Sequence, residues 1–185
     1  MTGGGSKKGG KENAGGYVKG ERGAFLAPDA NCGLEAVVSN KQKFEALYDI
    51  QKDDKGKEIV LGEGNYAAVK ICVENGTNSQ YAVKCIDGAK LHKEDVEGLK
   101  TELSLLRQLQ HEHIIFFKDY FEDNDKNYHY VVTELLQGGE LFTAIVAREK
   151  YTEVDARNTV MTIADALGYC HARGVVHRDL KPENI

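Results

Sequence analysis

Alternating apolar and polar positions predict several strands in the first two-thirds of the chain. Apolar side chains alternate from Ala67 to Val73, as in a half-buried strand, and Asn75-Gly76 marks a hairpin turn to a second strand over Tyr81–Ile86. The charged runs at 53–56 and 122–125 are turn signals. We expect further strands at three segments: Phe44–Ile50, Ile114–Phe121 and Tyr128–Leu135.

A helical pattern interrupts these strands from Lys93 to Gln110. Apolar residues recur there at three- and four-residue steps, which is the spacing of one helix face. Glu102 falls on the same face, and a carboxylate aimed at a core needs a cation beside it. The apolar members of this face are Val96, Leu99, Leu103, Leu106 and Leu109.

After Gly138-Gly139 the pattern becomes wholly helical. We expect a short helix over Glu140–Glu149 and a longer one opened by Thr152, with Asp155 as its capping-box partner. The apolar stripe of the longer helix is Ala156, Val160, Ile163, Ala164, Leu167 and Cys170.

These elements predict an α+β fold with two unequal parts. Residues 43–136 form a mostly antiparallel sheet with one helix, and residues 137–185 begin a helical part after a glycine-marked hinge near 133–139. Residues 1–42 are expected to be disordered or loosely docked, because residues 1–24 are rich in Gly and Lys and have few apolar side chains.

Composition narrows the class of protein. The net charge of −5 gives no reason to expect a nucleic acid partner, and no apolar run is long enough to span a membrane. The four cysteines form no Cys-x-x-Cys pair, so neither a disulfide framework nor a cysteine metal site is expected. A reducing cytoplasmic setting fits best.

The first chemical motif is a glycine loop, Gly62-x-Gly64-x-x-Ala67-x-Val69. A dinucleotide-binding loop would open a helix, whereas a strand is predicted after this one. Glycines let the backbone approach phosphate oxygens closely, and Ala67 in place of a third glycine should only stiffen the loop. The alternative is a glycine-marked hairpin that binds no ligand.

The second is a lysine inside an apolar strand. Lys84 would be costly there unless it is paired, and Glu102 is the evident partner. The alternative is that Lys84 reaches solvent at an edge of the sheet.

The third is a polar string behind the apolar pair Val175-Val176. Three polar residues, His177, Arg178 and Asp179, follow with no packing reason to be there, which predicts a short strand that delivers a polar loop to a cleft. His111 and His113 suggest a metal pair more weakly, and a structural role is expected for them because no third ligand is expected nearby.

In order and spacing, these motifs resemble those of protein kinases. The string His177-Arg178-Asp179-Leu180-x-x-x-Asn184 matches the catalytic loop, and Lys181-Pro182-Glu183 is typical of serine/threonine kinases. The stretches 138–142, 151–153 and 177–184 are most similar to the calcium/calmodulin-dependent kinase group. The fold this implies is an antiparallel five-stranded N-lobe with one main helix, and the first helices of an incomplete C-lobe.

The resemblance also implies roles for single residues. Asp179 would accept the proton of the substrate hydroxyl, Lys181 would steady the transferring phosphoryl group, and Lys84, oriented by Glu102, would contact the ATP phosphates. Asn184 would bind Mg²⁺, and His177 and Arg178 would be architectural. The other ATP-binding residues it implies are Leu61, Gly62, Glu63, Gly64, Asn65, Tyr66, Ala67, Val69, Ala82, the gatekeeper Thr133, the hinge residues Glu134 to Leu136, and Glu140.

The function implied is phosphoryl transfer from ATP to serine or threonine hydroxyls of proteins, with sites near basic residues met by Glu140 and Glu183. Calcium/calmodulin regulation would be encoded after this stretch. The second metal ligand and the activation segment should also lie beyond Ile185, so these 185 residues are expected to be an inactive fragment of an active kinase. Two alternatives stay open: a truncated, pseudokinase-like nucleotide-binding or interaction module, and a non-kinase protein with a glycine loop.

Overall fold

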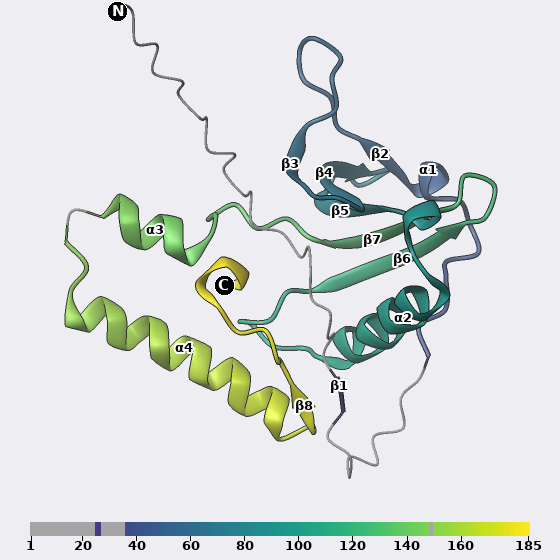
Figure 1. Ribbon diagram of the computed structural model, residues 1–185. Coiled ribbons are helices and arrows are strands. Elements are labelled where there is room, and N and C mark those ends of the chain that lie inside the picture. The colour runs from purple at the N-terminus through teal and green to yellow at the C-terminus, as the bar shows by residue number, and fades with distance from the viewer. Residues whose placement is uncertain (1–24, 27–35, 149) are drawn as a thin grey trace, which may run out of the picture.

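A curled antiparallel sheet forms the larger part of the molecule (Figure 1). The structure, a computed structural model, describes residues 25–26, 36–148 and 150–185. The strand order is β2-β4-β5-β7-β6, and β3 also pairs with β4. The strands are β2 (Tyr48–Ile50), β3 (Val60–Glu63), β4 (Ala67–Glu74), β5 (Gln80–Asp87), β6 (Phe117–Asp123) and β7 (Tyr128–Glu134).

The sheet has five rows because β2 and β3 share one edge of β4. Strand β2 pairs with residues 72–74 of β4, and β3 pairs with residues 68–70. Between them the chain folds back at the 53–56 turn, where Lys52 bridges Glu58 and Gly56 has a φ of +77°. The predicted five-stranded antiparallel sheet is confirmed, with an added hairpin in its edge row.

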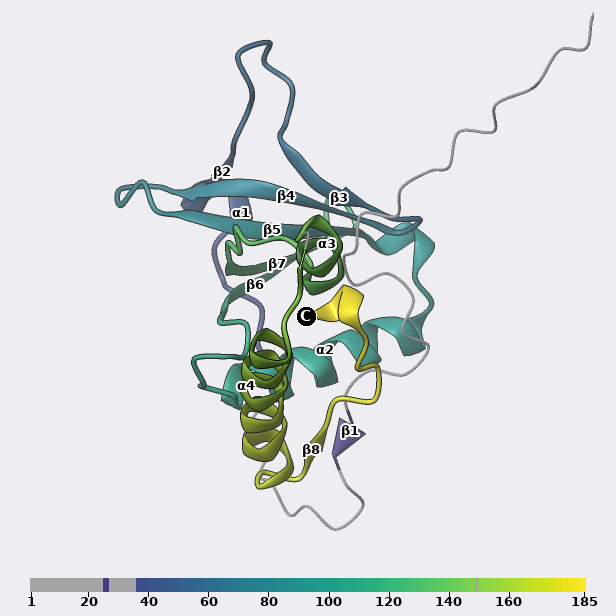
Figure 2. The ribbon, with the colours of Figure 1, turned by 90° about the vertical axis from the view of Figure 1, so that its left-hand side faces the viewer.

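The helices lie beside and below this sheet. The main helix α2 (Lys93–Gln108) covers one face, and α3 (Leu141–Ala147) and α4 (Glu153–His171) follow the last strand (Figures 1 and 2). Thr152 caps α4 together with Asp155 in the predicted capping box. Two short strands, β1 (Phe25–Leu26) and β8 (Val175–Val176), pair with each other outside the main sheet.

Side-chain parity gives the sheet two different faces. Val83, Cys85, Tyr130 and Val132 point to one face, where they form a core with aromatic residues. Ile86 and Val131 belong to the opposite face and pack with Leu103 of α2. The second face therefore holds both the helix and the predicted nucleotide residues of β5.

The first predicted strand is partly a helix. Phe44–Leu47 forms the one-turn helix α1, and only Tyr48–Ile50 is a strand. The Phe44 ring stacks on Tyr48 and on Tyr130, at centroid distances of 5.5 and 4.6 Å, and meets Phe121 edge-on. Residues four apart meet only in a helical turn, so packing of the Phe44 ring outweighs the strand-like pattern.

Other boundaries shift for local reasons. A turn closed by the Ile114 N–H and the His111 carbonyl (3.1 Å) delays β6 to Phe117, and β6 continues to Asp123, so the acidic turn moves to residues 124–127. The predicted stripe of α4 is covered only in part: Val160 and Ala164 are exposed, Cys170 in the last turn is buried, and the other three residues are half-buried. The predicted disorder of residues 1–24 lies outside the described residues. Within them, no helix is both long and apolar enough to cross a membrane.

We expect the substitution Phe44→Ala to reduce the free energy of unfolding by about 3–5 kcal/mol, because it empties the centre of the aromatic core. Phe44 is 3% exposed, and Phe142→Ala is the matched control because Phe142 is 55% exposed. Urea unfolding of both variants measures the difference. Equal losses at the two sites would contradict this assignment of the core.

Candidate functional site

The glycine loop is a strand-to-strand turn. The Gly64 N–H donates to the Ala67 carbonyl at 2.8 Å, and Gly62 pairs with Val69 after an irregularity in the β3 register. The carbonyls at the tip are held from below: Asn65 accepts from the Lys90 ammonium (3.2 Å) and Tyr66 accepts from the Asp87 N–H (2.9 Å). The loop joins two strands, so a dinucleotide-binding loop that opens a helix is excluded.

Residues predicted to surround the nucleotide share the α2 face of the sheet. Val69 of β4 lies opposite Lys84 of β5, and Ala82 lies opposite Thr133 of β7. Ala82 is buried, and Val69, Lys84 and Thr133 are half-buried. Leu61 and Leu136 are exposed, one before the glycine loop and one just after β7.

Glu134 at the end of β7 makes two hydrogen bonds to Phe116 that the sequence pattern did not predict. Its N–H donates to the Phe116 carbonyl at 3.0 Å, and its carboxylate accepts the Phe116 N–H at 2.6 Å. The segment after β7 is therefore anchored to the segment before β6 by two bonds to one residue.

Lys84 and Glu102 are electrostatic neighbours across the space between β5 and α2. Burial lowers the pKa of Lys84, and the Glu102 carboxylate opposes that change. Burial likewise raises the pKa of Glu102, and Lys84 and then His177 oppose it. The attraction between the two charges thus offsets part of the free-energy cost of burying each of them. Because His177 belongs to the polar string, the pKa of Glu102 also depends on that segment.

The polar string lies between α2 and the α3–α4 pair, below the sheet, where both views place the yellow C-terminal segment (Figures 1 and 2). Arg178 has a φ of +64°, which turns the chain sharply after β8. The Asp179 N–H then donates to Nδ1 of His177 at 3.3 Å.

Two side chains converge on one oxygen of Asp179. Oδ2 accepts a hydrogen bond from the Asn184 amide at 2.9 Å and lies 3.1 Å from the Lys181 ammonium. The Asn184 amide also donates to the Asp179 carbonyl at 2.8 Å. These bonds, that of Lys181 first, hold the pKa of the Asp179 carboxyl below its usual range. The carboxylate is therefore ionised and oriented.

The C-terminal turn is tied to α3. The Ile185 carbonyl accepts the Leu141 N–H at 2.7 Å, beside Glu140, the residue that precedes the helix. Glu140 is half-buried there, and its carbonyl accepts the Ala144 N–H at 3.0 Å.

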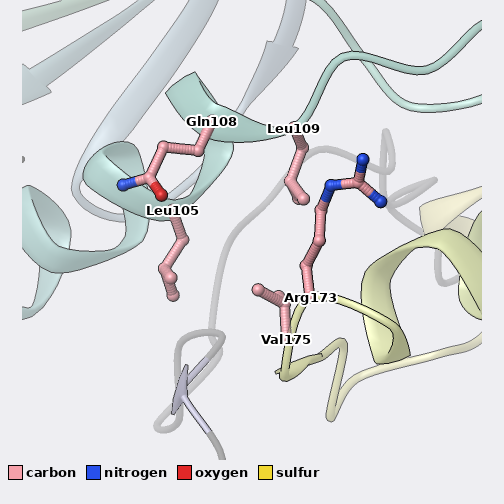
Figure 3. A pocket seen from close by; sticks show the side chains of 5 residues that line it. All are labelled: Leu105, Gln108, Leu109, Arg173 and Val175. Atoms are coloured by element: carbon pink, nitrogen blue, oxygen red, sulfur yellow. The ribbon is translucent and has the colours of Figure 1, made fainter. Parts of the chain in front are cut away.

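A hollow of about 310 Å³ lies outside these motifs, between the C-terminal end of α2 and β8 (Figure 3). Its lining side chains come from both sides: Leu105, Gln108, Leu109, Arg173 and Val175. None of them is a predicted nucleotide residue. Leu105, Leu109 and Val175 form a small core with Cys170, so this region joins α2 to the strand that precedes the polar string.

The expectation that no third ligand lies near His113 is wrong. Asp165 of α4 comes close, and Glu112, His113 and Asp165 offer ligand atoms within 4.8 Å of one another. All three residues are exposed, and the same Asp165 carboxylate already lies 3.2 Å from Nε2 of His111. The cluster links the loop after α2 to α4, and exposed groups of this kind do not by themselves make a metal site.

Comparisons with known proteins settle the family. The model of the protein kinase domain matches residues 56–185. The chain belongs to this family. This kinase chain is 41% identical to calcium/calmodulin-dependent protein kinase type II of Caenorhabditis briggsae and to the type II alpha chain of Drosophila melanogaster. Each alignment spans 143 residues, which are 77% of this chain and 25% of the relative. The delta subunit of calcium/calmodulin-dependent protein kinase type II from Oryctolagus cuniculus is also 41% identical. That alignment spans 125 residues, which are 68% of this chain and 23% of the relative.

The kinase chain thus spans about a quarter of the length of the curated relatives it matches. The sheet and α2 correspond to a kinase N-lobe, and α3, α4 and the polar string to part of a C-lobe. Membership of the family implies ATP and Mg²⁺ as ligands.

The residues present here offer one oxygen ligand for Mg²⁺ and a place for the phosphates. Because the Asn184 nitrogen donates to Asp179, the amide oxygen points away from it as a ligand of the kind that Mg²⁺ prefers. On the sheet, the loop over Gly62–Gly64 and the cation of Lys84 suit phosphate oxygens.

We expect Lys181→Met to raise the pKa of Asp179 toward its ordinary value, because the largest cause of the lowering is removed. Carboxyl ¹³C NMR during a pH titration measures this, with the exposed Lys55→Met as the control. The folded pKa is the lower one, so the carboxylate stabilises the fold above its unfolded-state pKa, and this contribution disappears as the pH falls through the folded value. An unchanged pKa in Lys181→Met would contradict the described contact.

Proposed function

We propose that the protein transfers the γ-phosphoryl group of ATP to serine or threonine hydroxyls of proteins. The observation that carries the proposal is the convergence of Lys181 and Asn184 on one Asp179 oxygen in a chain of the protein kinase family. The lysine two residues after the aspartate supports serine/threonine specificity, as does the likeness to calcium/calmodulin-dependent kinases.

In this proposal Asp179 is the base. An ionised carboxylate, oriented by its neighbours, suits the acceptance of a proton from a substrate hydroxyl. Lys181, 3.1 Å from that carboxylate, supplies positive charge where the phosphoryl group is transferred. Asn184 would be one ligand of Mg²⁺, and the ion, when bound, would supply charge that neutralises the phosphates.

The N-lobe residues hold the nucleotide. Lys84, kept in place by Glu102, binds phosphate oxygens under the glycine loop, from Gly62 to Ala67. Val69 and Ala82, on one face of the sheet, would cover the adenine ring, and the segment from Glu134 to Leu136 would hydrogen-bond it. Thr133 borders this space and Glu140 meets the ribose or a basic residue of the substrate.

Regulators belong to the same proposal. The relatives are named for dependence on calcium and calmodulin, and we extend that control to the whole protein. A cytoplasmic setting accords with the free, buried thiols of Cys72, Cys85 and Cys170.

The test is Asp179→Asn in the longest natural form of the protein. We expect transfer to a serine peptide with basic residues to fall by about 10²–10⁴-fold, because the base is lost, while binding of an ATP analogue persists. Asp54→Asn, at the exposed tip of the 51–59 hairpin, is the matched control. Transfer by Asp179→Asn at the control rate would refute the proposed base. Binding without any transfer by the unmodified protein would favour the nucleotide-binding module.

A further inference from the structure

Residues 36–40, here called the strap, run between α2 and β6 before the chain reaches α1. In Figure 1 the strap belongs to the dark-blue trace that passes α2 on its way to α1. At one end the Val37 N–H donates to Oγ of Ser104 in α2 at 2.8 Å. At the other end the Asn40 N–H donates to the Tyr120 carbonyl at 2.7 Å, and Oγ of Ser39 accepts the Glu122 N–H at 2.9 Å. The strap is thus bonded to the helix and to the sheet.

One side chain of the strap is part of the core under α2. Val37 is 8% exposed and packs in the cluster that contains Leu103 of α2 and Val131 of β7. Its neighbour Val38 is 72% exposed. The strap therefore has a defined inner face, and it occupies space between the helix and the sheet.

The hydrogen bond between the strap and α2 is made on the helix turn that carries Glu102. Oγ of Ser104 accepts from Val37 and donates to the Lys100 carbonyl at 2.6 Å, so the strap is joined to the helix turn that contains Glu102. The Lys100 ammonium reaches the Glu122 carboxylate at 2.7 Å, and the Glu122 N–H bonds the strap. Helix, strap and β6 thus form a closed set of contacts.

The strap lies before the residues that match the family model. The match begins at residue 56, whereas Val37 shares a core with β5, β7 and α2. Contacts that place α2 therefore come in part from a segment that the family model does not cover.

We propose that Val37 is a positioning residue, which acts through α2 to hold Glu102 beside Lys84. The Val37 side chain packs between the helix and the sheet, and its N–H bonds Ser104. Together these contacts set the separation between helix and sheet, and with it the position of the Glu102 carboxylate. The proposal rests on the proposed function for its kinetic consequence, namely binding of the ATP phosphates by Lys84.

The test compares Val37→Ala with Val38→Ala in the longest natural form of the protein, well below the unfolding temperature of each variant. We expect Val37→Ala to raise the KM for ATP by about 2- to 30-fold, the range for changes that act on a site through packed neighbours, with the KM for the peptide unchanged. Val38→Ala should leave both values unchanged, because its side chain is exposed.

A double-mutant cycle separates positioning from general loss of stability. If Val37 acts through Glu102, the effects of Val37→Ala and Glu102→Gln on the KM for ATP do not multiply. Multiplying effects, or a lower melting temperature with an unchanged KM for ATP, would overturn the proposal.

A second measurement does not depend on activity. Displacement of α2 changes both the burial that raises the Glu102 pKa and the contact with Lys84 that lowers it, so this pKa should shift in Val37→Ala and stay unchanged in Val38→Ala. Carboxyl ¹³C NMR of the 185-residue chain reports this pKa. If the unmodified protein transfers no phosphoryl group, the proposed function fails and the Glu102 pKa alone decides: a shift in either direction supports the positioning role, and an unchanged value rejects it.

Discussion

A cation on an interior strand is the constraint on which the rest of the site depends. Lys84 lies on β5, which has β4 on one side and β7 on the other, so its ammonium cannot leave by an edge of the sheet. It must find an anion above the sheet face or lose its charge. Glu102 provides that anion, so the position of α2 determines whether Lys84 has a counter-charge.

The two faces of the sheet differ: one carries an aromatic core, and the other carries the pair of Lys84 and Glu102. On one face, the rings of Phe44, Tyr48 and Tyr130 fill a core that needs no ligand. On the other face, Lys84 and Glu102 are only half-buried, which leaves room for a ligand to complete the desolvation. Parity along β5 enforces the division, because Val83 and Lys84 point in opposite directions.

Local patterns predicted those elements that local physics determines. The β4–β5 hairpin follows from alternation and the Asn75-Gly76 turn, and the start of α4 follows from the Thr152 cap. Helix α1 did not follow, since four residues of helix exist there only because the Phe44 ring packs among distant aromatic residues. The proximity of Asp165 to His113 likewise depends on how α4 docks, which no short pattern contains.

The same distinction applies to the site. The sequence identified Asp179, Lys181 and Asn184 as residue types in a known order. It contained no sign that two of them meet a single oxygen of the third. That meeting requires the tight turn of the chain at Arg178, whose positive φ is unusual for a residue other than glycine.

Helix α2 connects the two halves of this site physically. Its middle bears Glu102 and Ser104, which accepts the hydrogen bond from Val37 of the strap. Its end packs through Leu105 and Leu109 against Val175, just before the polar string. Figure 3 shows the side chains of this end facing those of Arg173 and Val175 across the hollow. Both sets of contacts are therefore made by one continuous helix. A movement of the whole helix away from β5 would therefore alter both the pair of Glu102 and Lys84 and the packing against Val175, which precedes the polar string.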